Sequence, residues 1–340
     1  MEVLLVDKQT YVIAEIGQAH DGSYGIAKSM IKAIANAGAD AVKFQMHIAD
    51  AESSENEEFR IKFSDIDKSR LDYWKRMEFS EDEWSLLKDY SESLGLDFLV
   101  TPFSVAAVER LNKINVGAFK IGSGDIQNDL MIDKILDAGK PIFFSNGLSD
   151  DTVIENLVRK LEKRNIGFTL FECTTAYPTK PEQIYLNNIL RYKEKFGCKV
   201  GLSDHSGEIY ASLAAVALGA NAIEVHVTFD KNMYGPDSMA SLNFSQLKDM
   251  IDGIKFIEKS LSVDKPKIHS NEKNSLIKLF GRSLAVNRNM EKGELVTREI
   301  MEAKKPMGYG INVNEYETIL NKKFKSSLKK GQFLNYDDLE

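Results

Sequence analysis

The chain has 340 residues, a formal net charge of −7 and the apolar fraction of an ordinary soluble protein, which suits one large α/β domain with a small appended module. This acidic balance argues against nucleic acid or an anionic membrane surface as the main partner, because both favour clustered Lys and Arg. The sequence has no basic N-terminal segment with a cleavage site, no apolar run long enough to span a bilayer and no CxxC pair, so we expect a reduced, cytoplasmic protein.

From residue 11 to about residue 261 the sequence repeats one pattern, in which a short β-branched or aromatic run is followed by a loop and an amphipathic stretch. The eight runs are, in chain order, YVIAEIG, AVKFQM, DFLVTPF, AFKIGSG, PIFFSNG, FTLFECTTAYP, KVGLSDH and AIEVHVTFD. Eight alternating strand and helix units predict an α/β fold of the (β/α)₈ TIM barrel type. A doubly wound sheet is the alternative, but it usually has fewer units and a GxGxxG turn after its first strand.

The pattern changes after SVDKPKIHSNEKN, a polar segment that we interpret as a linker. The rest of the chain has short strand-like runs, turn signals at EKGE and KKGQ, and no long helical pattern, which indicates a small separate module. The predicted domains are therefore a barrel over residues 1–262, a linker over 263–274 and a module over 275–340.

Polar side chains lie late in nearly every predicted strand, where the catalytic residues of such barrels collect. His205 and His226 end the last two runs, and imidazoles from adjacent parallel strands would converge on one point and bind a divalent metal. For one histidine alone, a structural hydrogen bond to a carbonyl is an equally good interpretation. The polar set at the strand ends favours the metal, and comprises Glu15, Lys43, Gln45, Thr101, Lys120, Ser123, Ser145, Thr174, Tyr177, Ser203, His205, Glu224 and His226.

Lys43 and Lys120 lie in strands that are predicted to be interior, where an unpaired ammonium group is costly. They imply either an anionic ligand or salt bridges to carboxylates such as Glu15. Because serines on neighbouring strands and the KIGSG backbone would lie close by, a ligand with phosphate and carboxylate groups is the better interpretation.

The short motifs together resemble a known family, the sialic acid synthases, which are phosphoenolpyruvate-dependent nonulosonate synthases. The similar segments are AEIGQAH, ADAVKFQ, TPFS, FKIGSGD, FSNG, CTTAYP, GLSDHS, EVHVTFD and GPDSMASL, and the C-terminal RSLAV, EKGELV and KKPMGYGI resemble that family's antifreeze-like (SAF) module. The resemblance implies a transferase that condenses phosphoenolpyruvate with an N-acylated amino sugar. The acceptor would be N-acetylmannosamine or a diacetamido-trideoxy hexose, and the products a nonulosonic acid and phosphate.

The resemblance also implies residue roles. A divalent metal, Mn²⁺ or Mg²⁺, would be held by His205 and His226. Phosphoenolpyruvate would be bound by Lys43, Lys120, Ser123, Ser145 and Ser203. The sugar and the reacting centre would be lined by Glu15, Gln45, Tyr177 and Asp237. Thr175 stands at a sugar-contacting position, and Thr101 is a further substrate-binding residue. Glu15 is our candidate for the carboxylate that takes a proton from water or stabilises a cationic intermediate, and both roles remain open.

Several residues depart from the family pattern, and all of them bear on the acceptor sugar. They are Ala19, Glu172, Thr175, Val225, Val227 and Ser238. The residues assigned to phosphoenolpyruvate and metal are unchanged, so the departures leave the identity of the sugar open.

Arg282, in KLFGRSLAV, matches an arginine that in the resembled family reaches into the sugar site of the other subunit. A guanidinium group suits this task because its fork of donors can hold an acyl carbonyl. A polar linker before a small module also fits an exchanged domain. We therefore expect a domain-swapped homodimer in which each module closes its partner's barrel.

Two other functions compete with this one. The first is a Schiff-base aldolase on the same barrel, with Lys43 or Lys120 as the nucleophile, and the second is a carbohydrate-binding protein without catalysis. We assign no catalytic role to the remaining histidines or to Cys173. His20 is expected in a loop, as a polar contact or a structural hydrogen-bonding group, while His47 and His269 are expected at the surface and Cys173 as a small buried residue.

Overall fold

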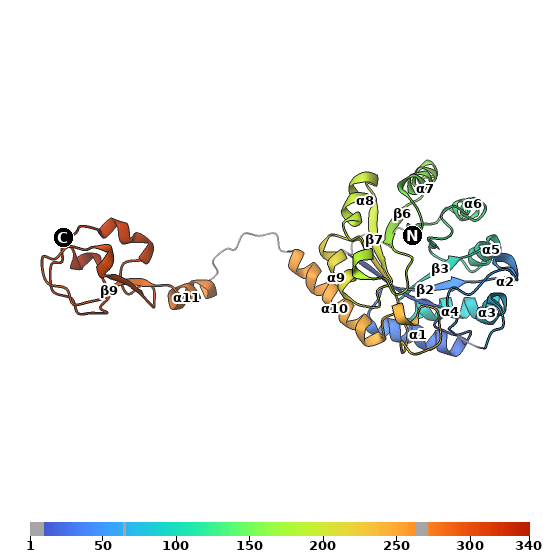
Figure 1. Cartoon of the computed structure of the whole chain (residues 1–340), viewed down its shortest axis with the longest axis horizontal. Helices are drawn as coiled ribbons and strands as arrows, with labels where there is room; N and C mark the ends of the chain where they lie inside the picture. Colours follow the sequence, from blue (N-terminus) through green and yellow to red (C-terminus); the bar gives the residue numbers. More distant parts are fainter. Residues whose placement is uncertain (1–9, 64–65, 263–270) are drawn as a thin grey trace. The chain divides into compact units, whose positions relative to one another are not determined.

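The computed structural model describes residues 10–63, 66–262 and 271–340, and the chain divides into two compact units with their boundary between residues 263 and 264 (Figure 1). Each unit has a hydrophobic core of its own. Within the described residues, no helix is long and apolar enough to cross a membrane.

The first unit contains eight parallel strands that pair in sequence order and close into a barrel, with β1 hydrogen-bonded to both β2 and β8. The strands are β1 Tyr11–Gly17, β2 Ala41–Met46, β3 Asp97–Pro102, β4 Phe119–Ile121, β5 Ile142–Ser145, β6 Phe168–Cys173, β7 Lys199–Asp204 and β8 Ala222–His226. Each lies within one of the eight predicted runs. The barrel prediction is confirmed, and the doubly wound alternative is wrong.

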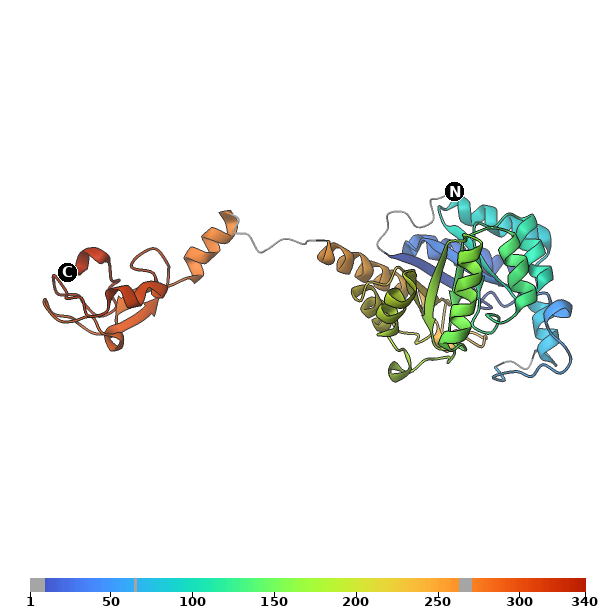
Figure 2. The same cartoon turned by 90° about the horizontal axis from the view of Figure 1, so that it is seen from above.

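Helices surround the strands on the outside, as both Figure 1 and Figure 2 show. Most begin at a Ser, Asn or Asp whose side chain accepts a hydrogen bond from the first helical turn, such as Ser104 before α5 and Asp150 before α7. The helices are α1 Tyr24–Ala37, α2 Ala49–Glu52, α3 Arg70–Met77, α4 Glu81–Ser93, α5 Val105–Lys113, α6 Asp129–Asp137, α7 Asp151–Lys163, α8 Asn188–Phe196, α9 Tyr210–Ala217 and α10 Phe244–Leu261.

The barrel interior has an apolar layer below a polar one. The apolar layer consists of Tyr11, Ile13, Ala41, Leu99, Ala118, Phe143, Phe171 and Ala222. Gly201 completes it, because a Cβ there would lie 2.7 Å from the Phe171 ring and 2.6 Å from the Ala222 carbonyl oxygen. Side chains two residues further along a strand point to the same face, so the next layer towards the strand C-termini holds the polar residues. This geometry places the candidate site at the C-terminal mouth of the barrel.

The second unit is small and built around an antiparallel pair, β9 Ser283–Val286 and β10 Met301–Lys304, with short 3₁₀ turns between its loops. Its core includes Leu284, Phe324 and Leu334. Helix α11, Asn271–Phe280, begins inside the segment that we expected to be linker. The run NEKNSLIKLF has no Gly or Pro to interrupt a helix, which explains the difference.

Candidate active site

Two lysines and two glutamates meet at the centre of the polar layer, and all four side chains are buried. Lys43 Nζ forms a close ion pair with Glu15 and lies 3.8 Å from Glu224 Oε2. Lys120 Nζ lies 3.5 Å from Glu224 Oε1. Hydroxyl groups from three further strands complete the layer: Lys43 donates to Thr101 Oγ1 at 3.0 Å, Lys120 donates to Ser145 Oγ at 2.6 Å, and Ser203 Oγ donates to Glu224 Oε1 at 3.0 Å.

The two carboxylates balance the two ammonium charges. Burial lowers the pKa of Lys43, but Glu15 and Glu224 more than offset this, so the pKa is raised overall. Burial also lowers the pKa of Lys120, and Glu224 offsets it only in part. For Glu224, burial would raise the pKa, but the two lysines together hold it well below its usual range. Both lysines therefore have salt-bridge partners, which is the alternative that the sequence left open, and charge balance alone does not require an anionic ligand.

His205 and His226 lie side by side above this layer, with their ring centroids 5.2 Å apart. His205 Nδ1 is 3.0 Å from the Thr174 carbonyl oxygen. A carbonyl oxygen can only accept, so the Nδ1–H group donates this hydrogen bond and Nε2 carries the free lone pair. His226 Nδ1 lies 3.9 Å from Asp237 Oδ2. Burial lowers the pKa of both imidazoles, which favours the neutral form that binds metals.

This donor set fits a divalent ion that takes its other ligands from water or substrate. Among residues 10–63, 66–262 and 271–340, no group of three His, Cys, Asp or Glu side chains could hold a metal by itself. An imidazole pair with one ring oriented by a carbonyl is nevertheless the arrangement in which open coordination positions remain for a substrate.

Gly147, in the FSNG motif, leaves room for the side chains of Ser123 and Thr175 beside the site. Its backbone N–H donates to Ser123 Oγ at 3.0 Å. A Cβ at this position would lie 2.5 Å from Thr175 Oγ1, 2.8 Å from Ser123 Oγ and 3.2 Å from Cys173 Sγ. Only glycine fits without displacing these side chains. Cys173 is buried as predicted, and burial raises the pKa of its thiol.

A pocket of about 390 Å³ opens at the barrel mouth and contains four of the predicted residues, Gln45, Thr175, Tyr177 and Asp237. The Tyr177 ring lies 4.2 Å from the His205 ring, so the pocket adjoins the histidine pair. The other lining residues were not assigned to the site from the sequence, and they are Gln18, His47, Glu52, Glu57, Arg60, Arg70, Trp74, Phe103, Asp125 and Pro236. Most of them lie in the chain between β2 and α4. This segment has no hydrophobic periodicity from which its position at the barrel mouth could be predicted.

The prediction that His47 lies at the surface is wrong. His47 is buried, with its ring stacked 3.7 Å from the Trp74 ring and 4.5 Å from the Phe103 ring. Its Nδ1 lies 2.6 Å from Glu52 Oε1. In the chain, α2 and the segment after it separate His47 from Trp74. The sequence next to His47 therefore gave no sign of this contact.

His20 is buried and accepts a hydrogen bond from the Gly22 N–H at 3.1 Å, which is the structural role that we considered for it. His269 lies outside the described residues. Arg282 belongs to the second unit, where it is exposed and its guanidinium donates to the Ala303 carbonyl oxygen at 3.1 Å.

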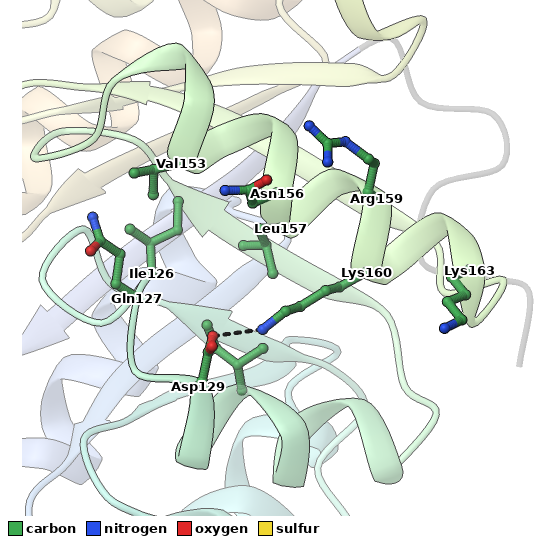
Figure 3. A pocket seen from close by; sticks show the side chains of 10 residues that line it. Ile126, Gln127, Asp129, Val153, Asn156, Leu157, Arg159, Lys160 and Lys163 are labelled. Carbon is green, nitrogen blue, oxygen red and sulfur yellow. Dashed lines mark hydrogen bonds and ion pairs between the residues drawn. The ribbon is translucent and has the colours of Figure 1, made fainter.

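A larger cavity, of about 510 Å³, lies on the outside of the barrel between α6 and α7 (Figure 3). There the Lys160 side chain points to Asp129 and forms an ion pair at 2.6 Å. None of the described residues that line it comes from the strand ends or the charged layer. The smaller pocket, which adjoins the buried charges and the histidine pair, is therefore the candidate active site.

A closed barrel with ionisable groups gathered at the strand C-termini defines the class of TIM-barrel enzymes. Comparison with known proteins identifies the family. The model of the NeuB family matches residues 30–265, and that of the SAF domain matches residues 281–340. The chain belongs to the NeuB family, which confirms the family that its motifs resemble.

Individual relatives cover nearly the whole chain. The N,N'-diacetyllegionaminic acid synthase of Campylobacter jejuni is 34% identical over 96% of this chain and 99% of its own. The pseudaminic acid synthase of the same species is 32% identical over 98% of both chains. The crystal structure of the N-acetylneuraminic acid synthetase of Leptospira borgpetersenii in complex with citrate covers 78% of this chain and 90% of its own, with 31% identity and a TM-score of 0.70.

Proposed function

We propose that this protein condenses phosphoenolpyruvate with an N-acylated amino sugar to form a nonulosonic acid and release phosphate. One observation carries the proposal: a polar pocket of about 390 Å³ lies next to a buried layer of paired lysines and glutamates. The Tyr177 ring of that pocket also contacts two imidazoles, those of His205 and His226. The relatives, whose names describe them as synthases of legionaminic, pseudaminic and N-acetylneuraminic acids, support the same reaction class. The protein is thus a transferase that forms a carbon–carbon bond.

The charged layer is the proposed phosphoenolpyruvate site. Lys43 and Lys120 would exchange part of their contact with Glu15 and Glu224 for the ligand's phosphate and carboxylate groups, with hydroxyls from Ser123, Ser145 and Ser203 as further donors. The aldehyde of the open-chain sugar would lie above this layer, in the pocket lined by Gln45, Thr175, Tyr177 and Asp237.

The reaction joins the methylene carbon of phosphoenolpyruvate to the aldehyde carbon of the sugar, and the aldehyde oxygen takes up a proton. Water then adds to the cationic C2 and loses one proton, which gives a tetrahedral intermediate with a hydroxyl and the phosphate on C2. The C2–O bond to phosphate then breaks, the hydroxyl oxygen becomes the ketone oxygen, and its proton leaves with phosphate to give the α-keto acid. Glu15 would accept the proton from water or stabilise the cation. Its Oε1, which is buried and has no hydrogen-bond partner among the described residues, supports this role. Mn²⁺ or Mg²⁺ held by His205 and His226 would supply Lewis-acid polarisation of the aldehyde.

The acceptor sugar is the finer part of the proposal. Two relatives of nearly equal identity, 34% and 32%, carry the names of synthases for different nonulosonic acids, so overall similarity does not choose between them. We retain N-acetylmannosamine and a diacetamido-trideoxy hexose as acceptors. We further propose a cytoplasmic, domain-swapped homodimer in which Arg282 of one subunit completes the sugar pocket of the other.

The test is phosphate release from phosphoenolpyruvate with a panel of N-acylated amino sugars and Mn²⁺, before and after exhaustive chelation. Phosphate should appear only when both substrates and the metal are present. The lowered pKa of Lys120 is a property that a Schiff-base lysine also needs, so borohydride is added in a parallel reaction. Turnover that survives chelation, together with inactivation by borohydride and a carbonyl substrate, would establish the aldolase instead.

A further inference from the structure

Arg60, in the chain between α2 and α3, contacts two other loops at the mouth of the barrel. Its Nη2 donates to Asp237 Oδ1 at 2.9 Å and to the Pro236 carbonyl oxygen at 3.2 Å, both in the chain after β8. Its guanidinium also lies over the Tyr177 ring, 4.4 Å from the centroid, after β6. One side chain thus links loops that follow three different strands of the barrel.

These contacts hold residues of the acceptor pocket in a defined orientation. Arg60 donates a hydrogen bond to one oxygen of Asp237, and the second oxygen faces His226 Nδ1 at 3.9 Å. The face of Tyr177 is covered by Arg60, and its ring lies 4.2 Å from the His205 ring. A planar guanidinium group can donate along its edge and stack on an aromatic ring, which an ammonium group cannot do with the same geometry.

Stability does not account for this arrangement. The Arg60 side chain is 43% exposed, and ion pairs of such exposure contribute little to folding. In contrast, a residue that orients pocket groups before the ligand arrives reduces the entropy lost on binding. Within the part of the chain that the structure describes, Arg60 contacts Tyr177, Pro236 and Asp237, which all line the sugar pocket, while the charged layer is built from other side chains.

We propose that Arg60 is a positioning residue for the acceptor sugar, which it serves by holding Asp237 and Tyr177 in their binding orientation. This inference rests on the proposed function. It assigns Arg60 to acceptor binding and not to phosphoenolpyruvate binding, although Arg60 is a cation and phosphoenolpyruvate an anion.

The experiment compares Arg60→Met and Arg60→Lys with the wild-type full-length protein, and uses Arg159→Met as the matched control. Arg159 is also exposed, and it lies on α7 outside the barrel. Arg60→Met should raise the KM for the acceptor about tenfold, the effect of losing one charge-assisted hydrogen bond, and leave the KM for phosphoenolpyruvate unchanged. Arg60→Lys should recover only part of the loss, and methylguanidinium added to an Arg60→Ala variant should restore acceptor binding.

The outcomes separate this inference from the proposed function. Equal increases in both KM values, a kcat loss with no change in KM, or behaviour like that of Arg159→Met would overturn the role of Arg60 while the wild-type reaction stands. A wild-type protein that releases no phosphate with any sugar would overturn the proposed function and this inference with it. Thermal unfolding of each variant shows whether a loss of folding, and not of positioning, explains its kinetics.

Discussion

Replacing Glu224 with Gln tests the buried charge balance most sharply. Glu224 lies 3.5 Å from Lys120 Nζ and 3.8 Å from Lys43 Nζ. Lys43 keeps Glu15 as a partner in the variant, but Lys120 is left with neutral neighbours, the Ser145 hydroxyl and the Phe171 ring 5.5 Å from its Nζ. Gln can still accept the hydrogen bond from Ser203, so the substitution removes charge and little else.

The loss of unfolding free energy should be about 3 kcal/mol at neutral pH, at the low end of the range for breaking a buried ion pair. The loss should also depend on pH. Burial already lowers the pKa of Lys120, and removing Glu224 takes away the carboxylate that raises it, so the pKa falls further in the variant. A group whose folded pKa lies below its unfolded value gains stability as the pH rises towards the unfolded value, so the deficit of the variant should shrink as the pH rises from neutrality towards the ordinary lysine pKa of about 10.4.

Urea unfolding at neutral pH and at a series of higher pH values measures this difference. Glu155→Gln is the matched control, because Glu155 pairs with Lys195 and Arg159 on the outer surface and should change stability by less than about 1 kcal/mol. A loss as small as that of the control, or one that does not change with pH, would refute the charge balance described here.

Three further predictions follow from individual residues. Lys43→Met or Lys120→Met should raise the KM for phosphoenolpyruvate far more than that for the sugar in the phosphate-release assay; equal losses would mean that both lysines serve only as salt-bridge partners. Burial lowers the pKa of His20 from 6.5 to about 3, so stability should decrease as the pH falls below about 6.5, and less steeply in His20→Gln; parallel urea-unfolding profiles would contradict this. Co-expressed His205→Ala and Arg282→Ala chains should regain activity in one of the two sites of the heterodimer, and confirmed heterodimers without activity would exclude the domain swap.

The sequence predicts the barrel well because each strand is buried on both faces and its apolar run is visible without knowledge of its neighbours. The polar residues late in the strands are equally predictable, since a fixed period of two places Lys43 and Thr101 above the apolar layer. The pairing of the two lysines was left open, because it depends on how close Glu15 and Glu224 come across the closed barrel.

The loop residues of the pocket could not be predicted from the sequence in this way. Contacts with distant elements set the positions of Arg60 and His47. Arg60 contacts Asp237, after β8, and His47 stacks on Trp74, in α3. Neither residue lies in a segment with a periodicity from which this could be inferred. Helix α11 was missed for a related reason, because its polar sequence differs little from that of a linker.

The most direct test of the central claim follows the bridging oxygen of phosphoenolpyruvate. Phosphoenolpyruvate labelled with ¹⁸O at the C2–O–P bridge is incubated with the accepted sugar, Mn²⁺ and the wild-type protein, and the released phosphate is analysed by mass spectrometry. If water adds at C2 in the charged layer, the label leaves with phosphate, and the nonulosonic acid carries none from the bridge. Label retained in the sugar acid, with unlabelled phosphate, would mean that water attacks phosphorus and would contradict the proposed reaction.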